Sequence, residues 1–205
     1  MQALNAIGIL LGSSWASGVN VYLTVAGLGI SQRLGWIELP GNLKIISHLL
    51  VILVALFLYM IEFFADKIPL VDSMWDVVHT VIRPLGGAAI AYLAMTGAPA
   101  ALQYSVALIS GTVSLDSHLT KATTRLAINT SPEPVTNSIA SVAEDGLVVG
   151  VLWLIIKHPF IAAFVVIAFI IFSVWFLRKM FRFVKKISRS LAGLERHPEM
   201  AARSL

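Results

Sequence analysis

The sequence contains no cysteine among its 205 residues, which excludes disulfides, thiolate metal sites and cysteine nucleophiles. Charge is also scarce, because charged residues make up 13% of the chain and hydrophobic residues 58%, with a mean hydropathy of +0.85. A soluble domain has about 25% charged residues, so this composition is typical of an integral membrane protein. The signatures HExxH, GxxxxGK(S/T) and GxSxG are missing as well. Metalloprotease, P-loop and serine-hydrolase functions therefore have no support.

Apolar runs long enough to cross about 30 Å of hydrocarbon indicate where helices lie. Two runs are clear and four are weaker: 45–65 and 159–177, then 3–31, 85–97, 100–127 and 139–156. The runs of ten alternating residues that a membrane barrel needs are absent from the sequence. The sequence thus predicts an all-α fold, a polytopic transmembrane bundle of about six helices with an amphipathic or re-entrant segment near 70–83. The N-terminal run lacks a preceding basic region and a cleavage site, so we expect it to be retained.

Basic residues gather at the C-terminal end. Eight of the 15 Lys and Arg lie between Arg178 and Arg203, with only two acids among them. We therefore expect one transmembrane domain over 1–182 and a basic cytoplasmic tail over 183–205. With six spans and this tail inside, twelve basic residues lie on the cytoplasmic side and three outside, which fits a multi-pass protein of the bacterial inner membrane. The tail's position beside a membrane span explains its charge, so we do not expect nucleic acid as a partner. The expected partner is the lipid bilayer, and formation of a homo-oligomer stays open.

One stretch, FFADKIPLVDSMWDVVHTVIRP at 63–84, interrupts the apolar runs with ionisable side chains. Six charges facing lipid would cost about 18 kcal/mol, against about 6 kcal/mol gained from its apolar residues. The stretch must therefore lie at the interface or turn its charges into a protein-lined interior. We expect a helix that begins at Ser73, capped by Asp72, on which four side chains fall on one stripe. These are Asp72, Asp76, His79 and Arg83.

A second stripe lies in HLTKATTRLAIN, where His118, Lys121 and Arg125 recur at i, i+3 and i+7. Either Lys121 and Arg125 mark a cytoplasmic helix end, or they pair across the bundle with Asp72, Asp76 or the acids of SVAEDG. Those acids, Glu144 and Asp145, either bind a ligand or simply start a helix near the interface.

The candidate binding or transport residues form one set of ionisable side chains. They are Glu62, Asp66, Lys67, Asp72, Asp76, His79, Arg83, His118, Lys121, Arg125, Glu144 and Asp145. No catalytic residue is assigned, and the metal requirement is unknown. In SGVNVY, Gly18, Asn20 and Tyr22 are interpreted as a close helix contact and not as a ligand site.

Three segments carry a resemblance to a known family. With ADKIPLVDSMWDVVHTVIRPLGGA, HLTKATTRLAIN and SIASVAEDG, the chain resembles the bacterial membrane proteins grouped as domain of unknown function 4126, over about residues 10–175. The resemblance implies a multi-helix integral membrane protein and implies no particular activity.

Three functions are compatible with these residues. The leading prediction is a small transporter or channel whose charged intramembrane site takes a cation, a proton or a small charged solute. The alternative is a membrane enzyme acting on a lipid headgroup phosphate, in which Asp72 and Asp76 hold a divalent cation, Lys121 or Arg125 holds the phosphate and His79 is the base. The third is a structural or assembly role, in which the charges only fasten helices together.

Overall fold

A computed structural model describes residues 2–68, 70–129 and 134–196 of the chain. The described residues form seven α-helices and one 3-10 helix, and they contain no strand. The elements are α1 (Gln2–Val19), α2 (Val21–Arg33), the 3-10 helix η1 (Gly41–Ser47), α3 (Leu49–Ala65), α4 (Val71–Ala94), α5 (Ala100–Ile128), α6 (Pro134–Lys157) and α7 (Pro159–Arg196). The predicted all-helical bundle is confirmed.

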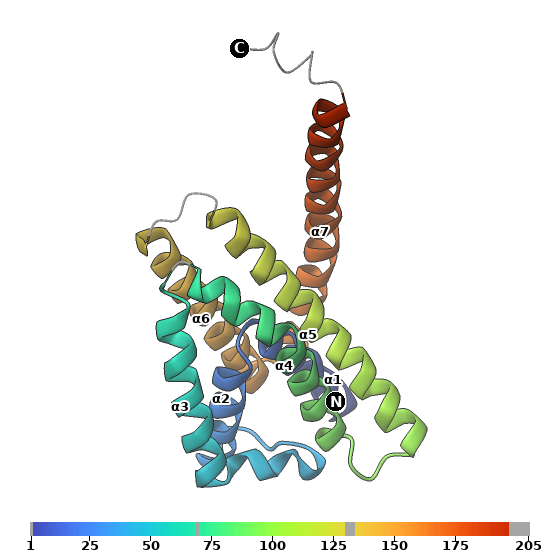
Figure 1. Ribbon diagram of the computed structural model, residues 1–205. Coiled ribbons are helices and arrows are strands. Elements are labelled where there is room, and N and C mark those ends of the chain that lie inside the picture. The colour runs from blue at the N-terminus through green and yellow to red at the C-terminus, as the bar shows by residue number, and fades with distance from the viewer. Residues whose placement is uncertain (1, 69, 130–133, 197–205) are drawn as a thin grey trace.

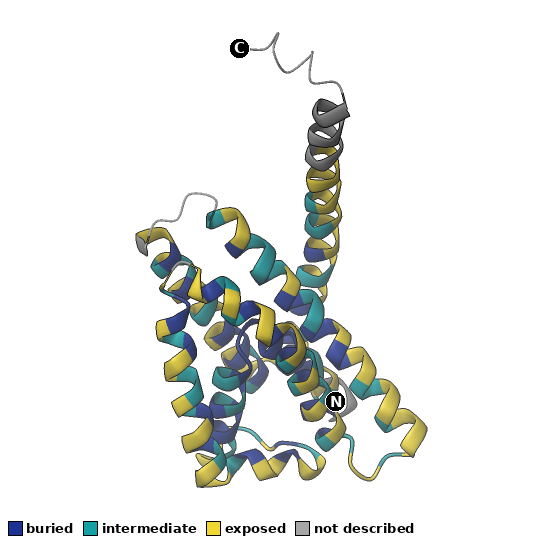
Figure 2. Ribbon diagram, viewed as in Figure 1, coloured by how far each residue is buried: buried dark blue, intermediate teal, exposed yellow. Residues whose placement is uncertain are grey.

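Three of the described helices are long and apolar enough to cross a membrane: α4, α6 over Val135–Lys157 and α7 over Pro159–Lys186. A fourth span results if η1 and α3, which meet at a bend of 69°, are counted together. Helix α1 lies at the centre of the bundle in Figure 1 and contacts α4, α5, α6 and α7. Figure 2 shows exposed residues along the outer faces of the helices. Many of these are large and apolar, such as Phe57, Leu108 and Phe164, as expected of surfaces in contact with lipid.

The run at 3–31 forms two helices instead of one. The chain breaks at Asn20, whose φ of −154° and ψ of 100° are extended, and the Asn20 side chain caps α2 by accepting a hydrogen bond from the Leu23 backbone N–H at 2.9 Å. Ser13 and Ser14 do not interrupt α1, because each hydroxyl donates to the carbonyl four residues earlier, at 2.6 Å. The two serines are thus compatible with the helix, whereas α1 ends just before Asn20.

Helix α4 combines two segments that the sequence predicts to be separate. It runs from Val71 to Ala94 through Pro84, so the expected span at 85–97 is its C-terminal half. Its start is also earlier than predicted, because the N-cap position is Leu70, and Asp72 lies in the first turn with its Oδ1 accepting from the Ser73 backbone N–H at 2.6 Å. Pro84 has no N–H to donate to the Thr80 carbonyl, and α4 nevertheless continues through it. Next to Pro84, Ser114 on α5 donates to the Arg83 carbonyl at 2.8 Å and so ties α5 to α4 at this position.

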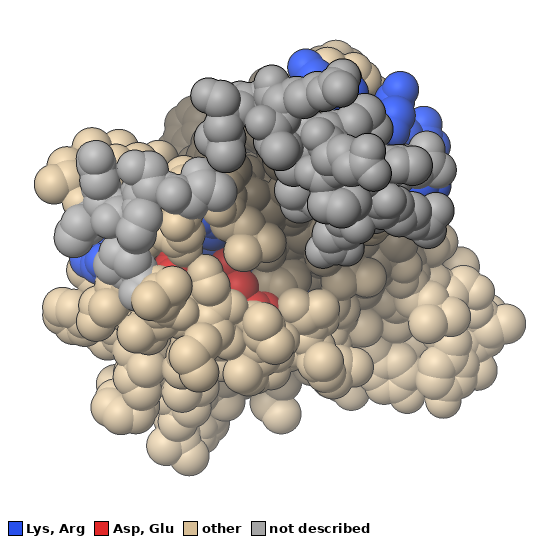
Figure 3. Space-filling model, turned by 45° about the horizontal axis from the view of Figure 1, so that its top comes forward, with Lys and Arg blue, Asp and Glu red and all other residues tan. Residues whose placement is uncertain are grey.

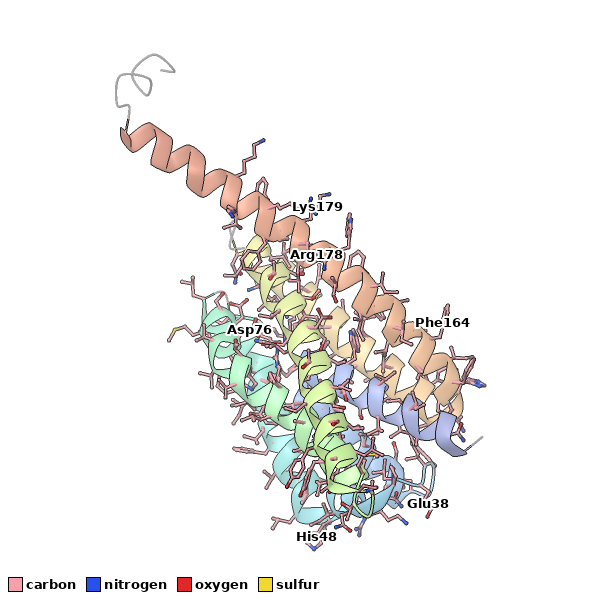
Figure 4. All side chains as sticks on the ribbon, turned by 90° about the vertical axis from the view of Figure 1, so that its right-hand side faces the viewer. Glu38, His48, Asp76, Phe164, Arg178 and Lys179 are labelled. Atoms are coloured by element: carbon pink, nitrogen blue, oxygen red, sulfur yellow. The ribbon has the colours of Figure 1, made fainter. Side chains whose placement is uncertain are left out.

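Helix α7 is the longest element and extends beyond the rest of the bundle in Figure 1. It continues to Arg196 through the expected domain boundary at 182/183, and residues 197–205 lie outside the described part of the chain. Figure 4 shows Arg178 and Lys179 on this extension, at the end of the bundle opposite to Glu38 and His48.

Candidate functional site

The ionisable side chains predicted from the sequence converge in the interior of the bundle. They come from α3 and the turn after it, α4, α5 and α6, and nine of the twelve are buried. The three that are only partly buried are Lys67, Glu144 and Asp145. We call these twelve residues the charged cluster. Figure 3 shows acidic and basic side chains in a recess at one end of the molecule, surrounded by uncharged residues.

The burial of α4 excludes an interfacial helix with its acids in water. Asp72 is 1% exposed and Asp76 4%, whereas Met74 and Val77 on the opposite face are each 73% exposed. Because the outward face is apolar and the charged stripe faces protein, the charges turn inward, as the second of the two sequence-based alternatives states.

Arg83 lies at the centre of the charged cluster and is fully buried. Its Nη2 donates to Glu62 Oε1 at 2.7 Å, and its Nη1 lies 3.3 Å from Asp76 Oδ1. The same Nη1 donates to His118 Nδ1 at 2.7 Å and to the Gly18 carbonyl at 3.4 Å. One guanidinium therefore joins α1, α3, α4 and α5.

Lys121 and Arg125 pair with acids across the bundle instead of marking a helix end. Lys121 Nζ lies 2.7 Å from Asp66 Oδ2, 3.5 Å from Glu144 Oε2 and 3.6 Å from Glu62 Oε1. Arg125 binds Glu144 through two hydrogen bonds, from Nε at 3.0 Å and from Nη2 at 2.6 Å. Such bidentate contacts are among the strongest in proteins. The expected pairing with the acids of SVAEDG is confirmed for Glu144, and in the described structure neither base forms an ion pair with Asp72 or Asp76.

The hydrogen bonds fix the protonation of only one histidine of the charged cluster. His79 Nδ1 donates to the Trp75 carbonyl at 2.8 Å, and its Nε2 lies 3.2 Å from the Tyr22 hydroxyl and 3.8 Å from Glu62 Oε2. His118 Nδ1 accepts from Arg83, so its Nε2 donates to the Thr80 hydroxyl at 3.0 Å. The His118 imidazole is therefore neutral, because an Arg nitrogen can only donate to its Nδ1.

Two acids of the charged cluster have only neutral partners among the described residues. The Asp72 carboxylate accepts from the side-chain amides of Asn129, at 2.9 and 3.0 Å, and Asn137, at 3.2 Å. Asp145 accepts from Asn20 at 3.2 Å and from the Tyr59 hydroxyl at 3.0 Å. In the described structure, no Lys or Arg nitrogen lies within 4 Å of either carboxylate.

Acids outnumber bases in the charged cluster. Six carboxylates face four Lys and Arg side chains, namely Lys67, Arg83, Lys121 and Arg125. Three buried carboxylate oxygens have no hydrogen-bond partner among the described residues: Glu62 Oε2, Asp66 Oδ1 and Asp76 Oδ2. Two buried donors, Arg83 Nε and Trp75 Nε1, also lack a partner among the described residues. The charged cluster therefore has fewer Lys and Arg side chains than carboxylates, and its polar atoms are incompletely paired.

The break between α1 and α2 lies against the charged cluster. The Gly18 and Val19 carbonyls at the end of α1 accept from Arg83 and Lys121, each at 3.4 Å. These carbonyls carry the partial negative charge of the helix end, and the two cations neutralise it. Asn20, at the break, caps α2 with its oxygen and donates to Asp145 with its amide. Ends of interrupted helices that contact charged groups inside a membrane are a recurring feature of transporter sites.

Comparison with known proteins identifies a family. The model of the family described as "Domain of unknown function (DUF4126)" matches residues 7–179. The chain belongs to this family. The matched region contains all twelve residues of the charged cluster and the break at Asn20, and it confirms the family suggested by the sequence motifs. No curated protein and no solved structure gave a significant match.

Sequence reasoning missed the neutral partners of the charged cluster. Asn129, Asn137 and Tyr59 hold the acids in place, yet none stands out from its surroundings in the sequence. Asn20 and Tyr22 are noticeable as polar residues in an apolar run, and they were interpreted as packing residues. The structure instead gives both a direct hydrogen bond to the charged cluster. A polar side chain in an apolar run is the available signal, although it does not reveal the partner.

The residues proposed for a divalent cation do not form a common site. Asp72 and Asp76 are one turn apart, but Asp72 faces Asn129 and Asn137 whereas Asp76 faces Arg83. Within residues 2–68, 70–129 and 134–196, no group of three or more His, Asp or Glu side chains is arranged to hold a metal ion.

Proposed function

We propose that the protein is a small membrane transporter or channel whose charged cluster binds a proton or another cation during transport. The proposal rests on the excess of two carboxylates over Lys and Arg side chains in a largely buried site. An uncompensated carboxylate away from water is costly, and it is relieved either by taking up a proton or by binding a cation. The unpartnered oxygens of Glu62, Asp66 and Asp76 offer places for such uptake.

The same charge balance argues against a phosphate-binding enzyme. Arg83, Lys121 and Arg125 each lie within 4 Å of two or more carboxylates. A phosphate would have to displace these acids and would add negative charge to a site that already has an excess of it. A purely structural role is also less well supported, because fastening helices requires balanced pairs and not surplus acids.

The distribution of basic residues supports a cytoplasmic C-terminus. The α7 residues Arg178 and Lys179 lie toward the end of the bundle where Asp76 is found, opposite to Glu38 and His48 (Figure 4). The positive-inside rule assigns that end to the cytoplasm, and the proposed location is the bacterial inner membrane. The charged cluster would then be nearer the cytoplasmic side of the bilayer.

Asp76→Asn and Asp145→Asn are expected to abolish transport without unfolding the protein. Each change keeps the shape of the side chain and removes its charge, and neither residue is the main partner of a buried base, since Arg83 retains Glu62 at 2.7 Å. Proton or cation flux into proteoliposomes, followed with an enclosed pH indicator or a radioactive cation, should fall to the level of empty liposomes.

Glu38→Gln is the matched control for the flux experiment. Glu38 is an exposed acid on the other side of the bundle, paired only with Lys44 at 2.9 Å among the described residues, so its neutralisation should leave flux unchanged. Wild-type flux in both Asp variants would show that the charged cluster is structural.

A further inference from the structure

A cavity of about 220 Å³ between α1, α5, α6 and α7 reaches the charged cluster at Lys121 and Glu144. Its lining also includes Leu147 on α6 and Phe172 on α7, which are 47% and 52% exposed. Leu147 and Phe172 thus place the cavity beside exposed faces of α6 and α7, two helices that are long and apolar enough to span the bilayer. We call it the lateral pocket.

The hydroxyl groups of the lateral pocket present acceptors to a ligand. Ser117, Thr120 and Thr124 each donate their single hydroxyl proton to a backbone carbonyl, at 2.9, 3.0 and 2.8 Å. The single hydroxyl proton of Ser173 is likewise engaged, since its Oγ lies within hydrogen-bond distance of the Asp116 carboxylate and of the Ile170 carbonyl. A hydroxyl whose proton is engaged in this way offers only its lone pairs. The pocket therefore favours a ligand rich in donors.

The charged side chains of the lateral pocket strengthen this preference. The Lys121 ammonium is directed to Asp66, Glu62, Glu144 and the Val19 carbonyl, so its donors are engaged within the charged cluster. Glu144 has the most exposed carboxylate among the ion-paired acids of the charged cluster, at 15%, and it lines the cavity. Glu144, which lines the pocket, is thus also the most exposed of the ion-paired acids in the charged cluster.

Aromatic rings form the apolar wall of the lateral pocket. Trp15 and Phe169 stack with centroids 4.8 Å apart, and Phe172 lies on the same side of the cavity. Aromatic faces attract cations in desolvated sites and also pack against apolar groups. A ligand with an ammonium group on a short hydrocarbon or aromatic body could donate to the hydroxyl oxygens and pack its body against the rings.

We propose that the lateral pocket binds a small organic ammonium ion, with an apolar body and a donating –NH₃⁺ head, that enters from the bilayer. This inference rests on the proposed function and names the class of solute carried. The head donates to the hydroxyl oxygens of the α5 face and lies near Glu144, and the body packs on Phe172 and Trp15. The volume of about 220 Å³ is below the range of about 300–1,000 Å³ of drug-sized sites, which restricts the ligand to small amines.

Binding to the full-length protein in nanodiscs tests the proposal, with phenethylammonium as the probe and calorimetry as the measurement. Phenethyl alcohol and 3-phenylpropionate are the neutral and anionic comparisons, and we expect phenethylammonium to bind at least about tenfold more tightly than either. Equal binding of all three compounds, or no binding of phenethylammonium, would overturn the proposal.

Two variants with matched controls locate the binding site. Thr124→Val and Phe172→Leu remove one acceptor and one ring, and they should weaken binding by about fivefold and about tenfold. Thr112→Val and Phe164→Leu change the same residue types on exposed parts of α5 and α7 outside the pocket, and they should leave binding unchanged. Figure 4 shows Phe164 at the periphery of the bundle. If the pocket and control variants bind equally, the site lies elsewhere and the proposal fails.

Failure of this inference is distinguishable from failure of the proposed function. Flux that depends on Asp76, without binding of phenethylammonium, would overturn the lateral pocket and leave transport by the charged cluster intact. Binding that depends on Thr124 and Phe172, without any flux that depends on Asp76, would overturn transport and leave the pocket as a binding site.

Discussion

Arg83→Met is expected to destabilise the protein by about 3–5 kcal/mol, because removal of one partner from a buried ion pair leaves the other charge uncompensated. Arg83 is fully buried, and its loss leaves the buried Asp76 without a Lys or Arg partner among the described residues and leaves the buried Glu62 with Lys121 at 3.6 Å as its nearest such partner. It also removes the donor to His118 Nδ1 and to the Gly18 carbonyl, so the contact between α1, α3, α4 and α5 is weakened at one point. The free energy of unfolding in mixed detergent, followed by circular dichroism, measures the effect.

A second substitution identifies the cause of this loss. In Glu62→Gln/Arg83→Met the strongest stranded charge is removed, so part of the stability should return, as double-mutant analysis of coupled pairs predicts. Arg178→Met, on the exposed extension of α7, changes the same residue type and should have little effect. If Arg83→Met unfolds no more easily than Arg178→Met, the charge of Arg83 is not needed to hold the helices together.

The spacing of the side chains predicted which face of α4 contributes to the charged cluster. Asp72, Asp76, His79 and Arg83 lie at i, i+4, i+7 and i+11, and all four are buried. The cost of exposing these charges to lipid already required them to point inward or to reach water. Composition and periodicity were sufficient for the helical bundle and for the stripe on α4. The choice between the interface and a shared interior required the structure.

The pairing of particular acids with particular bases could not be predicted. Spacing along one helix does not determine which helix lies opposite, so Lys121 could not be assigned to Asp66, or Arg125 to Glu144, before the order of helices was known. The start of α6 was also misplaced. Helix α6 begins at Pro134 and not near 139, which puts Glu144 well inside the helix, where it reaches Arg125.

Helix breaks were the other feature that local patterns predicted poorly. Pro84 should end a helix and does not, whereas Asn20 interrupts one without proline or glycine at that position. In both places a side chain from another helix contacts the backbone or the residue concerned, since Ser114 donates to the Arg83 carbonyl and Asp145 accepts from Asn20. Tertiary contacts thus override local propensity where the backbone lies next to polar side chains.

Gly18→Ala is expected to destabilise the protein by about 3 kcal/mol, the upper end of the usual cost of overpacking. A Cβ at Gly18 would lie 1.8 Å from Ser117 Oγ and 2.1 Å from the Ser114 carbonyl oxygen, which is backbone and cannot rotate away. Helices α1 and α5 would have to separate, which confirms the sequence-based interpretation of Gly18 as a close helix contact. The shift also moves the Gly18 carbonyl, to which Arg83 donates. Thermal unfolding in detergent measures the effect.

Gly150→Ala on α6 is the matched control, because a Cβ there meets no atom within 4 Å. In that position the added methyl group raises helix propensity and should stabilise the protein by up to about 1 kcal/mol. The two variants make the same chemical change in opposite surroundings, so their difference isolates the close approach of α1 to α5. Equal stability of the two would mean that this approach tolerates a methyl group. The charged cluster would then not depend on a tight crossing at the end of α1.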